Sequence, residues 1–337
     1  MNRVAKKQIL ITGGTGLIGE SLIEYFIALG GTVFVLTRHV KKAQQQFNSN
    51  DVVKQVKCTV KIIHSADSST LTLFNDSVTI YLIESLSEIP ALQSINWVIN
   101  LAGEPIVDRH WSEQQKHNIW RSRVDFTKTL VEWMQTRENL PEVLISGSAV
   151  GWYGDGEDRI LDETCPPHHE FTHELCDAWE RAAMVAESLN VRVCVVRTGI
   201  VLSPRGGFMP RLLTPFKLGL ATVLGDGNQY LSWIHIQDMV RAIVFLIHNE
   251  SRQCHGEFNL TAPQPVTNRE FTQLLCEQLK RWCLFRVPEG LFELTMGERA
   301  RLLIKGQRVI PARLESLGFE FKFSQLKSAL GDILIDC

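Results

Sequence analysis

Short hydrophobic runs alternate with longer amphipathic segments from the N-terminus to Arg197. Runs of about four to eight apolar residues are typical of strands buried in a parallel sheet, whereas apolar residues recurring every three or four positions indicate helices. The predicted strands are Gln8–Thr12, Val33–Thr37, Val60–His64, Trp97–Leu101, Val143–Ser146 and Val191–Arg197. The predicted helices are Leu17–Leu29, Ser112–Thr136 and Phe171–Leu189. This alternation predicts an α/β fold, a doubly wound parallel sheet with helices on both faces.

The chain changes character in two places. Between Val40 and Asn96 it is polar and rich in Ser and Asn, and it holds one or two further strands that the pattern does not locate. After Arg197, Pro and Gly interrupt the pattern repeatedly, which is typical of a second lobe laid over the strand ends. We therefore predict a first domain over 1–206, to which about 233–262 returns, and a smaller C-terminal α/β substrate lobe with a terminal module over 207–337. Ser112 has a hydroxyl that can accept a hydrogen bond from a first-turn amide, so we expect it to cap its helix.

A glycine-rich loop follows the first predicted strand. Gly13, Gly16 and Gly19 are spaced as GxxGxxG directly before an amphipathic segment. Gly13 permits a tight turn, Gly16 lets the backbone approach a pyrophosphate, and Gly19 lets the helix pack closely against the strand. The helix N-terminus then offers free amides and a positive dipole end to the phosphates. A glycine-rich turn without a ligand is the alternative, but the strand before it and the helix after it favour a Rossmann dinucleotide site.

The second predicted strand indicates which dinucleotide binds. An NAD site places Asp or Glu near the end of this strand, against the adenosine ribose hydroxyls. This chain has Thr37 and Arg38 there. A guanidinium can bind a ribose 2′-phosphate through two charged hydrogen bonds, whereas a carboxylate would repel it. We therefore expect the cofactor to be NADP(H), with the alternative that Arg38 is a solvated arginine at the start of the basic run His39–Lys42.

Composition and charge narrow the expected partners. The formal net charge of −2 provides no field that would attract polyanions, so nucleic acid is not an expected partner. No apolar run approaches the roughly 20 residues of a transmembrane helix, and no signal peptide is evident. We therefore expect no membrane partner and a cytoplasmic location. The eight cysteines are scattered without a CxxC pair, so we expect them to be reduced and mostly structural.

Motifs along the whole chain resemble those of one protein family. The segment Val98–Glu104 is similar to the one that ends the fourth strand of short-chain dehydrogenases and lines the cofactor. The further matches are Trp111, Arg121–Arg123, Ser146–Gly154, Trp179–Glu180, Arg197–Leu202, Pro215–Gly219, Gly225–Gly227, Trp233–Asp238 and Gly306–Pro311. Together they resemble the atypical, epimerase-like branch of the short-chain dehydrogenase/reductase family, of the YfcH type, including the C-terminal module of that branch.

The resemblance implies a set of cofactor contacts at the carboxyl ends of the strands. They are Gly13, Thr15, Gly16, Leu17, Ile18, Gly19, Thr37, Arg38, Leu101, Ala102, Asn118, Arg123 and Val201. The superfamily often dimerises through paired helices, so the resemblance also allows a homodimer.

The resemblance also indicates an unusual reaction centre. Ordinary members pair a Tyr with a Lys four residues later, because the ammonium lowers the pKa of the phenol that passes a proton. Aligning Glu180 with the glutamate that commonly follows this Lys places Cys176 at the Lys position and Thr172 at the Tyr position. Threonine is too weak an acid, and cysteine brings no positive charge. We therefore reject standard Tyr/Lys hydride chemistry.

Four polar residues near the expected mouth of the site are candidates instead. Ser148 and Tyr153 are the candidate catalytic residues, and Ser146 and His235 are the candidate substrate-binding residues. The alternative is that Tyr153 is a wall residue whose hydroxyl finds a backbone partner, and that His235 is a structural histidine bridging loops.

Two other kinds of site are weighed and set aside. His169, His173 and Cys176 have a helical spacing that could ligate zinc, but a fourth ligand is missing, so we expect no metal. The glycines around Ser148 lie at the wrong offsets for the nucleophile elbow of a hydrolase. The leading hypothesis is an NADP(H)-dependent, epimerase-like oxidoreductase acting on an unknown small-molecule substrate, for which a sugar-like molecule is one candidate. The competing hypothesis is a non-catalytic NADP(H)-binding sensor or interaction protein.

Overall fold

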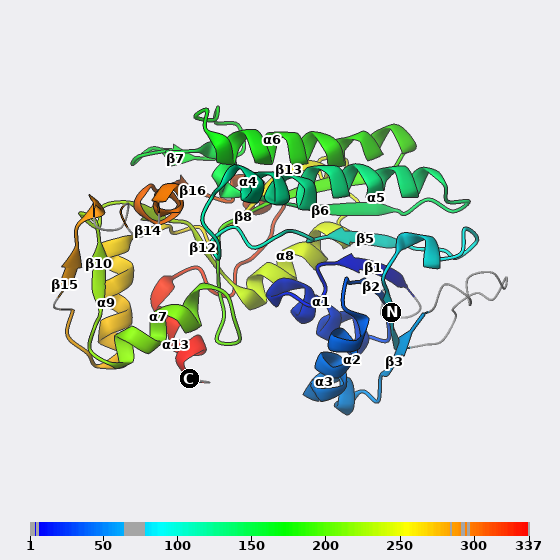
Figure 1. The fold of residues 1–337 in the computed structure, drawn as a ribbon, viewed down its shortest axis with the longest axis horizontal. Helices are drawn as coiled ribbons and strands as arrows, with labels where there is room; N and C mark the ends of the chain where they lie inside the picture. The colour runs from blue at the N-terminus through cyan, green and yellow to red at the C-terminus, as the bar shows by residue number, and fades with distance from the viewer. Residues whose placement is uncertain are drawn as a thin grey trace.

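One parallel sheet organises the molecule in the computed structural model, which describes residues 4, 7–63, 78–283, 285–290, 294 and 297–335. Within these residues eight strands form the sheet in the order β13-β8-β6-β5-β1-β2-β4-β3, each parallel to its neighbours (Figure 1). Their bounds are β1 Gln8–Thr12, β2 Thr32–Leu36, β3 Thr59–Ile62, β4 Thr79–Ile83, β5 Trp97–Asn100, β6 Val143–Ala149, β8 Arg192–Thr198 and β13 Gly256–Leu260. The strand order reverses between β1 and β5, and ligands of such sheets bind at the carboxyl ends of the strands at this point.

Helices cover both faces of the sheet (Figure 1). On one face lie α1 Leu17–Ala28, α2 Val40–Ser49, α3 Asp51–Gln55 and α8 Ile236–His248. On the other face lie α4 Glu113–Trp120, α5 Phe126–Gln135 and α6 Phe171–Met184. Alternating residues of one strand enter different cores, since Ile9 and Ile11 face α1 whereas Leu10 faces α5. Burial on both faces explains why the strands have continuous hydrophobic runs. The predicted doubly wound parallel sheet is confirmed.

The strands found from the sequence differ from the observed ones mainly at their ends. Gln8–Thr12 has the predicted bounds, and β3 covers most of the predicted run, whose last residue His64 lies outside the described residues. The pattern did not locate β4, Thr79–Ile83, although all of its residues are buried. A run of this length within a polar stretch cannot be distinguished from a buried helical segment by periodicity alone.

The helix that begins after Ser112 contains an irregular turn. The Ser112 hydroxyl accepts a hydrogen bond from the amide of Gln115 at 3.2 Å, so the predicted cap is present. Helix α4 then passes through a π-helical turn, η3 Arg121–Asp125, before α5 begins. Such turns are frequent at functional sites. Arg123 lies in this turn, and a Cβ added to Gly103 would lie 2.9 Å from its Cζ atom.

A smaller lobe lies at one end of the sheet (Figure 1). Its helices are α7 Phe208–Lys217, α9 Asn268–Leu279 and α13 Leu326–Ile335, which share a hydrophobic core. Short paired strands accompany them: β10 Thr222–Leu224 with β15 Phe285–Val287, β11 Tyr230–Leu231 with β14 Val266–Thr267, and β9 Ile200–Leu202 with β12 Trp233–His235. Further short helical turns are η2 Leu86–Glu88, η4 Val150–Tyr153, η5 Val185–Leu189 and η6 Gly297–Ala300.

The C-terminal segment contributes to both parts of the molecule. After α11 (Arg301–Ile304), strand β16 (Arg308–Val309) pairs with β7 (Ile160–Leu161). Helix α12 (Ala312–Ser316) then packs on β13, and Leu314 enters the core beneath the sheet. Finally, α13 packs against α9 in the smaller lobe. The segment therefore ties the lobe to the edge of the sheet.

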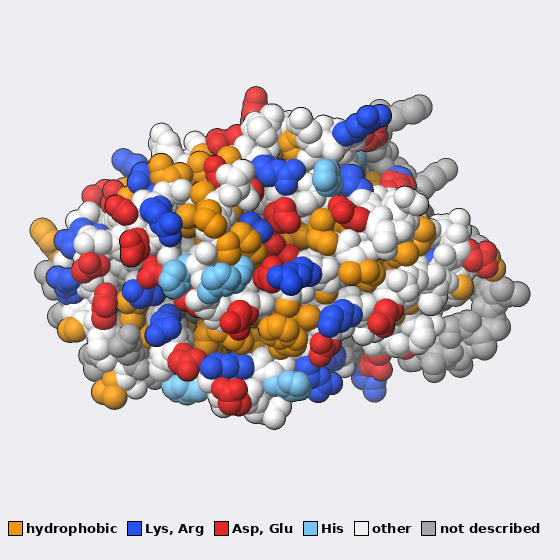
Figure 2. Space-filling model, turned by 90° about the horizontal axis from the view of Figure 1, so that it is seen from above, with side chains coloured by type: hydrophobic (Ala, Val, Ile, Leu, Met, Phe, Trp, Pro, Cys, Tyr) orange, Lys and Arg blue, Asp and Glu red, His pale blue; other side chains and the backbone are white. Residues whose placement is uncertain are grey.

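The surface over α4, α5 and α6 carries charges of both signs. Lys and Arg side chains are interspersed with Asp and Glu across this face (Figure 2). This mixture fits the small net charge of −2 and produces no extended field of one sign on this face. Among the described residues, no helix combines the length and the apolar character that crossing a bilayer requires.

Candidate functional site

The glycine loop connects the carboxyl end of β1 to the start of α1. Gly13 has a φ of +70°, a conformation that residues with a side chain rarely adopt. A Cβ at Gly13 would lie 2.5 Å from the carbonyl oxygen of Leu101, so the loop touches the end of β5. A Cβ at Gly19 would lie 2.4 Å from the carbonyl oxygen of Gly13, so the first turn of α1 packs directly on the loop. Only glycine fits at both positions, and the result is the close strand–helix approach of a dinucleotide site.

The start of α1 is suited to bind phosphate groups. Gly16 is the N-cap, and it provides no side chain to bond the first-turn amides. Thr15 and Gly16 are exposed, while Leu17 and Ile18 are half-buried at the helix start. Uncapped amides and the positive end of the helix dipole together attract anions.

Two predicted contacts come from later elements. Val201 on β9 lies near α1, because a Cβ at Gly207 would lie 3.2 Å from Leu17 Cδ2 and 3.7 Å from the Val201 carbonyl oxygen. Asn118 on α4 is half-buried, and its side-chain oxygen accepts a hydrogen bond from Gln114 at 3.2 Å. The fold therefore brings Val201 to the glycine loop, whereas Asn118 already has a neighbouring partner on its own helix.

Hydroxyl and amide groups fix the end of β5 beside the glycine loop. Thr12 Oγ1 donates to Asn100 Oδ1 at 2.7 Å and accepts from the amide of Ala102 at 3.2 Å. The amide of Leu101 donates to the Thr12 carbonyl oxygen at 3.2 Å. Arg123 packs beyond this strand end, and burial lowers the pKa of its guanidinium. A cation withdrawn from water is stabilised by an anionic partner, so this position suits contact with a charged cofactor.

Arg38 lies just beyond the end of β2, where NADP(H) recognition needs a cation. Its side chain is 84% exposed, and Nη2 lies 3.7 Å from the Glu104 carboxylate. Thr37 is half-buried, and its hydroxyl accepts from the amide of His39 at 3.3 Å. An exposed arginine with so distant an ionic partner can turn toward a phosphate.

A buried ion pair joins α6 to β8. The guanidinium of Arg197 donates to both carboxylate oxygens of Glu180, at 2.9 and 2.8 Å, and the two side chains are 3% and 6% exposed. Ser148 on β6 donates to Glu180 at 2.6 Å. Tyr153 donates to Asn259 on β13 at 2.8 Å and accepts from Arg197 at 3.4 Å. One polar network therefore connects three strands of the sheet with α6.

This network includes Ser148 and Tyr153, whose catalytic roles stay predictions. Both side chains are buried, and their hydroxyls donate to Glu180 and Asn259. Burial raises the pKa of Tyr153 to about 12, far from the range in which a general acid works near neutral pH. Both hydroxyls therefore already have hydrogen-bond partners within or beside the ion-pair network.

Thr172 and Cys176 lie one turn apart on α6, at the positions aligned with the missing pair. The Thr172 hydroxyl donates to Glu170 at 2.7 Å. Burial raises the pKa of the Cys176 thiol to about 12. Neither group can exchange a proton readily near neutral pH, which supports the rejection of Tyr/Lys chemistry.

The two predicted substrate-binding residues both lie inside the protein. Ser146 is fully buried, and its hydroxyl has no hydrogen-bond partner in the described part of the chain. His235 is equally buried, and its Nδ1 accepts from the amide of Gln237 at 3.1 Å, which caps α8. Its Nε2 lies 3.2 Å from Asp332, and its ring lies 3.9 Å from that of Phe323. His235 therefore joins α8 to the C-terminal segment, and the substrate-binding roles of both residues stay predictions.

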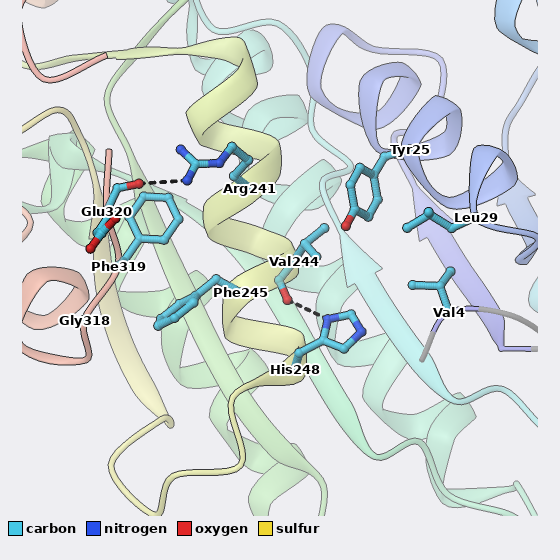
Figure 3. A pocket seen from close by; sticks show the side chains of 10 residues that line it. All are labelled: Val4, Tyr25, Leu29, Arg241, Val244, Phe245, His248, Gly318, Phe319 and Glu320. Carbon is cyan, nitrogen blue, oxygen red and sulfur yellow. Dashed lines mark hydrogen bonds between the residues drawn. The ribbon is translucent and has the colours of Figure 1, made fainter. Parts of the chain in front are cut away.

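A pocket of about 630 Å³ lies elsewhere, across the outer face of α8 (Figure 3). Phe245 and Phe319 lie on one side of this helix, with Tyr25, Leu29 and His248 on the other. Tyr25 and Leu29 are at the end of α1 opposite to the glycine loop. None of the predicted site residues lines this pocket.

The zinc alternative gains no support from the geometry. Among the described residues, no group of three or more His, Cys, Asp or Glu is arranged to hold a metal ion. His173 Nδ1 lies 2.9 Å from the carbonyl oxygen of Trp152, and Cys176 is buried. The cysteines in the described ranges are free thiols.

Two ionic contacts of the site were not predicted from the sequence. Glu180 meets Arg197, and Arg38 meets Glu104, only because the fold brings distant segments together. All four residues stand in segments that the sequence singled out. The available signal was that Arg38 and Glu104 each follow a predicted strand, and that carboxyl ends of parallel strands share one edge.

These features define a dinucleotide-binding protein of the Rossmann class: a glycine loop at the point of strand reversal, uncapped amides behind it, and a cation after the second strand. The model of the NAD dependent epimerase/dehydratase family matches residues 9–261, and a domain of unknown function (DUF1731) matches residues 287–333. The chain therefore belongs to the NAD dependent epimerase/dehydratase family, and the resemblance found in its sequence is confirmed.

Its relatives carry the same family label. An epimerase family protein of Staphylococcus aureus (SAR0825) is 33% identical over 97% of this chain and 99% of its own length. The chloroplastic SDR39U1 homolog of Arabidopsis thaliana is 34% identical over 97% of this chain and 86% of its own length. The crystal structure of human epimerase family protein SDR39U1 with NADPH matches 98% of this chain and 100% of its own, with a TM-score of 0.78 and 28% identity. The structure of the human relative thus shares the fold of this chain.

Replacing Glu180 by Gln should destabilise the fold by about 3–5 kcal/mol, because Arg197 would remain buried without its carboxylate partner. Urea unfolding measures this loss. Asp177→Asn on the same helix is the matched control, since it removes an exposed pair with Arg181 and should cost less than about 1 kcal/mol. Similar small losses in both variants would contradict the structural role of the buried pair.

Burial lowers the pKa of His235, although Asp332 and Asp238 oppose this shift. The folded state then binds the proton less readily than the unfolded state, so stability should fall as the pH drops below the ordinary value of 6.5. His235→Asn keeps an acceptor at the N-cap but does not titrate. We expect its free energy of unfolding to fall less steeply than that of the wild type between about pH 6.5 and 5. Parallel pH profiles of the two proteins in chemical unfolding would rule this out.

Proposed function

We propose that this protein is an NADP(H)-dependent oxidoreductase or epimerase-like enzyme that acts on a small molecule without the usual Tyr/Lys pair. The observation that carries the cofactor preference is the exposed Arg38 guanidinium at the end of β2, where an NAD site needs a carboxylate. When bound, NADP(H) would supply the hydride chemistry. The NADPH in the structure of the human relative supports this choice.

The described residues fit such a cofactor. The uncapped amides at the start of α1 would hold the pyrophosphate, and Arg38 would hold the 2′-phosphate. Leu101 and Ala102 at the end of β5 would line the cofactor beside Gly13, whose missing side chain permits this approach. The substrate would then bind between this edge and the smaller lobe, and sugar-like molecules are one candidate class.

A second function is favoured by one specific observation. The hydroxyls of Ser148 and Tyr153 are buried in the ion-pair network, and Thr172 and Cys176 replace the usual pair. A non-catalytic NADP(H)-binding sensor would need none of these groups to face a substrate. Cytoplasmic location and homodimer formation remain predictions.

Arg38→Asp should weaken NADPH binding by well over about tenfold and leave NADH binding nearly unchanged, because the new carboxylate repels the 2′-phosphate. Fluorescence titration of the purified protein with both nucleotides measures the two dissociation constants. Lys42→Asp is the control, because this exposed lysine belongs to the same basic run but lies farther along it. Equal loss of both nucleotides in Arg38→Asp, or equal effects of the two variants on NADPH, would refute the role of Arg38.

The enzyme and the sensor differ in turnover. We expect the wild type to oxidise NADPH in the presence of at least one member of a panel of small aldehydes, ketones and keto sugars. The loss of NADPH absorbance measures this turnover. Mass spectrometry of copurifying small molecules extends the panel. Tight NADPH binding without turnover of any compound in the panel would favour the non-catalytic sensor.

A further inference from the structure

Two charged residues of the candidate site face each other across the glycine loop. Arg38 follows β2 and Glu104 follows β5, and β1 lies between these two strands in the sheet. The loop continues from β1, and its Gly13 touches the end of β5. The contact of 3.7 Å between Arg38 and Glu104 therefore bridges the edge along which a dinucleotide would extend.

The two partners of this bridge are held differently. The backbone amide of Glu104 donates to the hydroxyl of Ser122 at 2.9 Å, and the Glu104 side chain is 21% exposed. The positive charge of Arg123 also acts on this carboxylate. Arg38, by contrast, is 84% exposed. The carboxylate is therefore the more buried partner on an anchored backbone, and the exposed guanidinium is the one that can turn away.

We propose that Glu104 is a specificity-determining residue, whose carboxylate competes with the 2′-phosphate of NADP(H) for the Arg38 guanidinium. The inference rests on the proposed NADP(H) binding. A guanidinium offers the same N–H groups to a carboxylate and to a phosphate, so binding of the 2′-phosphate displaces Glu104. NAD(H) has no phosphate at this position, and the Arg38–Glu104 contact can persist beside it. Glu104 therefore reduces the preference for NADP(H) over NAD(H).

The expected effect is modest, because the bridge is partly exposed and long. Exposed ion pairs contribute little to stability, so removal of the competitor should strengthen NADPH binding by about two- to fivefold. The effect should shrink as salt is added, since mobile ions screen exposed charges.

The experiment measures NADPH and NADH dissociation constants for the full chain by fluorescence titration at low salt. The variants are Glu104→Gln, Arg38→Gln and the double variant. Glu20→Gln is the control, because Glu20 is another carboxylate beside the glycine loop but accepts hydrogen bonds from the neutral amides of Gln46 and Asn50, at 3.1 Å each. The ratio of the two dissociation constants is the readout, because an effect transmitted through Arg123 would change both nucleotides alike.

We expect Glu104→Gln to raise the NADPH/NADH preference, Glu20→Gln to leave it unchanged, and the gain to vanish when Arg38 is already Gln. Equal tightening of both nucleotides would show general charge repulsion instead and overturn the competition. Weaker NADPH binding in Glu104→Gln would also overturn it, because Glu104 would then be a direct contact of the cofactor. Failure of the wild type to bind NADPH would refute the proposed function itself. If the wild type binds NADPH but Glu104→Gln leaves the ratio of the two dissociation constants unchanged, only the competition by Glu104 is overturned.

Discussion

The buried ion pair between Glu180 and Arg197 is the interaction on which the centre of the structure depends. Two charges withdrawn from water are tolerated only when each is paired and hydrogen-bonded. Ser148 completes the shell of Glu180, and Tyr153 links Arg197 to Asn259 on the edge strand. The hydroxyls of Ser148 and Tyr153 therefore help to stabilise the two charges. The same requirement connects α6 to the strands at the carboxyl edge of the sheet.

The cofactor edge obeys a different constraint, which is close approach of backbones. Gly13 and Gly19 have no room for side chains, so β1, β5 and α1 meet at one point and leave uncapped amides there. Charge then selects the ligand: Arg38 faces outward, and Glu104 stands opposite it. The close strand–helix approach of a dinucleotide site is thus present at this edge, while Ser148 and Tyr153 form hydrogen bonds in the network around Glu180 and Arg197.

The C-terminal segment connects the sheet and its helices to the smaller lobe. Leu314 packs beneath the sheet, and His235 caps α8 while it contacts Asp332 of α13. His235 therefore links α8, which covers the sheet, to α13 of the smaller lobe. The contact of His235 with Asp332 joins segments that lie nearly a hundred residues apart in the chain, so it could not be predicted from the sequence of α8 alone.

The sequence by itself determined the elements and signals that depend on neighbouring residues. The strand β1, the glycine loop, the cap at Ser112 and the cation at Arg38 all follow from local spacing, because backbone geometry and capping act over a few positions. Strand β4 and the π turn around Arg123 were not predicted from the sequence. A short apolar run has no distinct period, and one inserted residue in a helix does not produce a recognisable pattern. Only the tertiary structure decided the hydrogen-bond partners of Ser148, Tyr153 and His235, and the pairing of Arg38 with Glu104. Whether a polar side chain faces a ligand or a buried partner depends on which distant segment packs against it, and packing is a property of the whole fold.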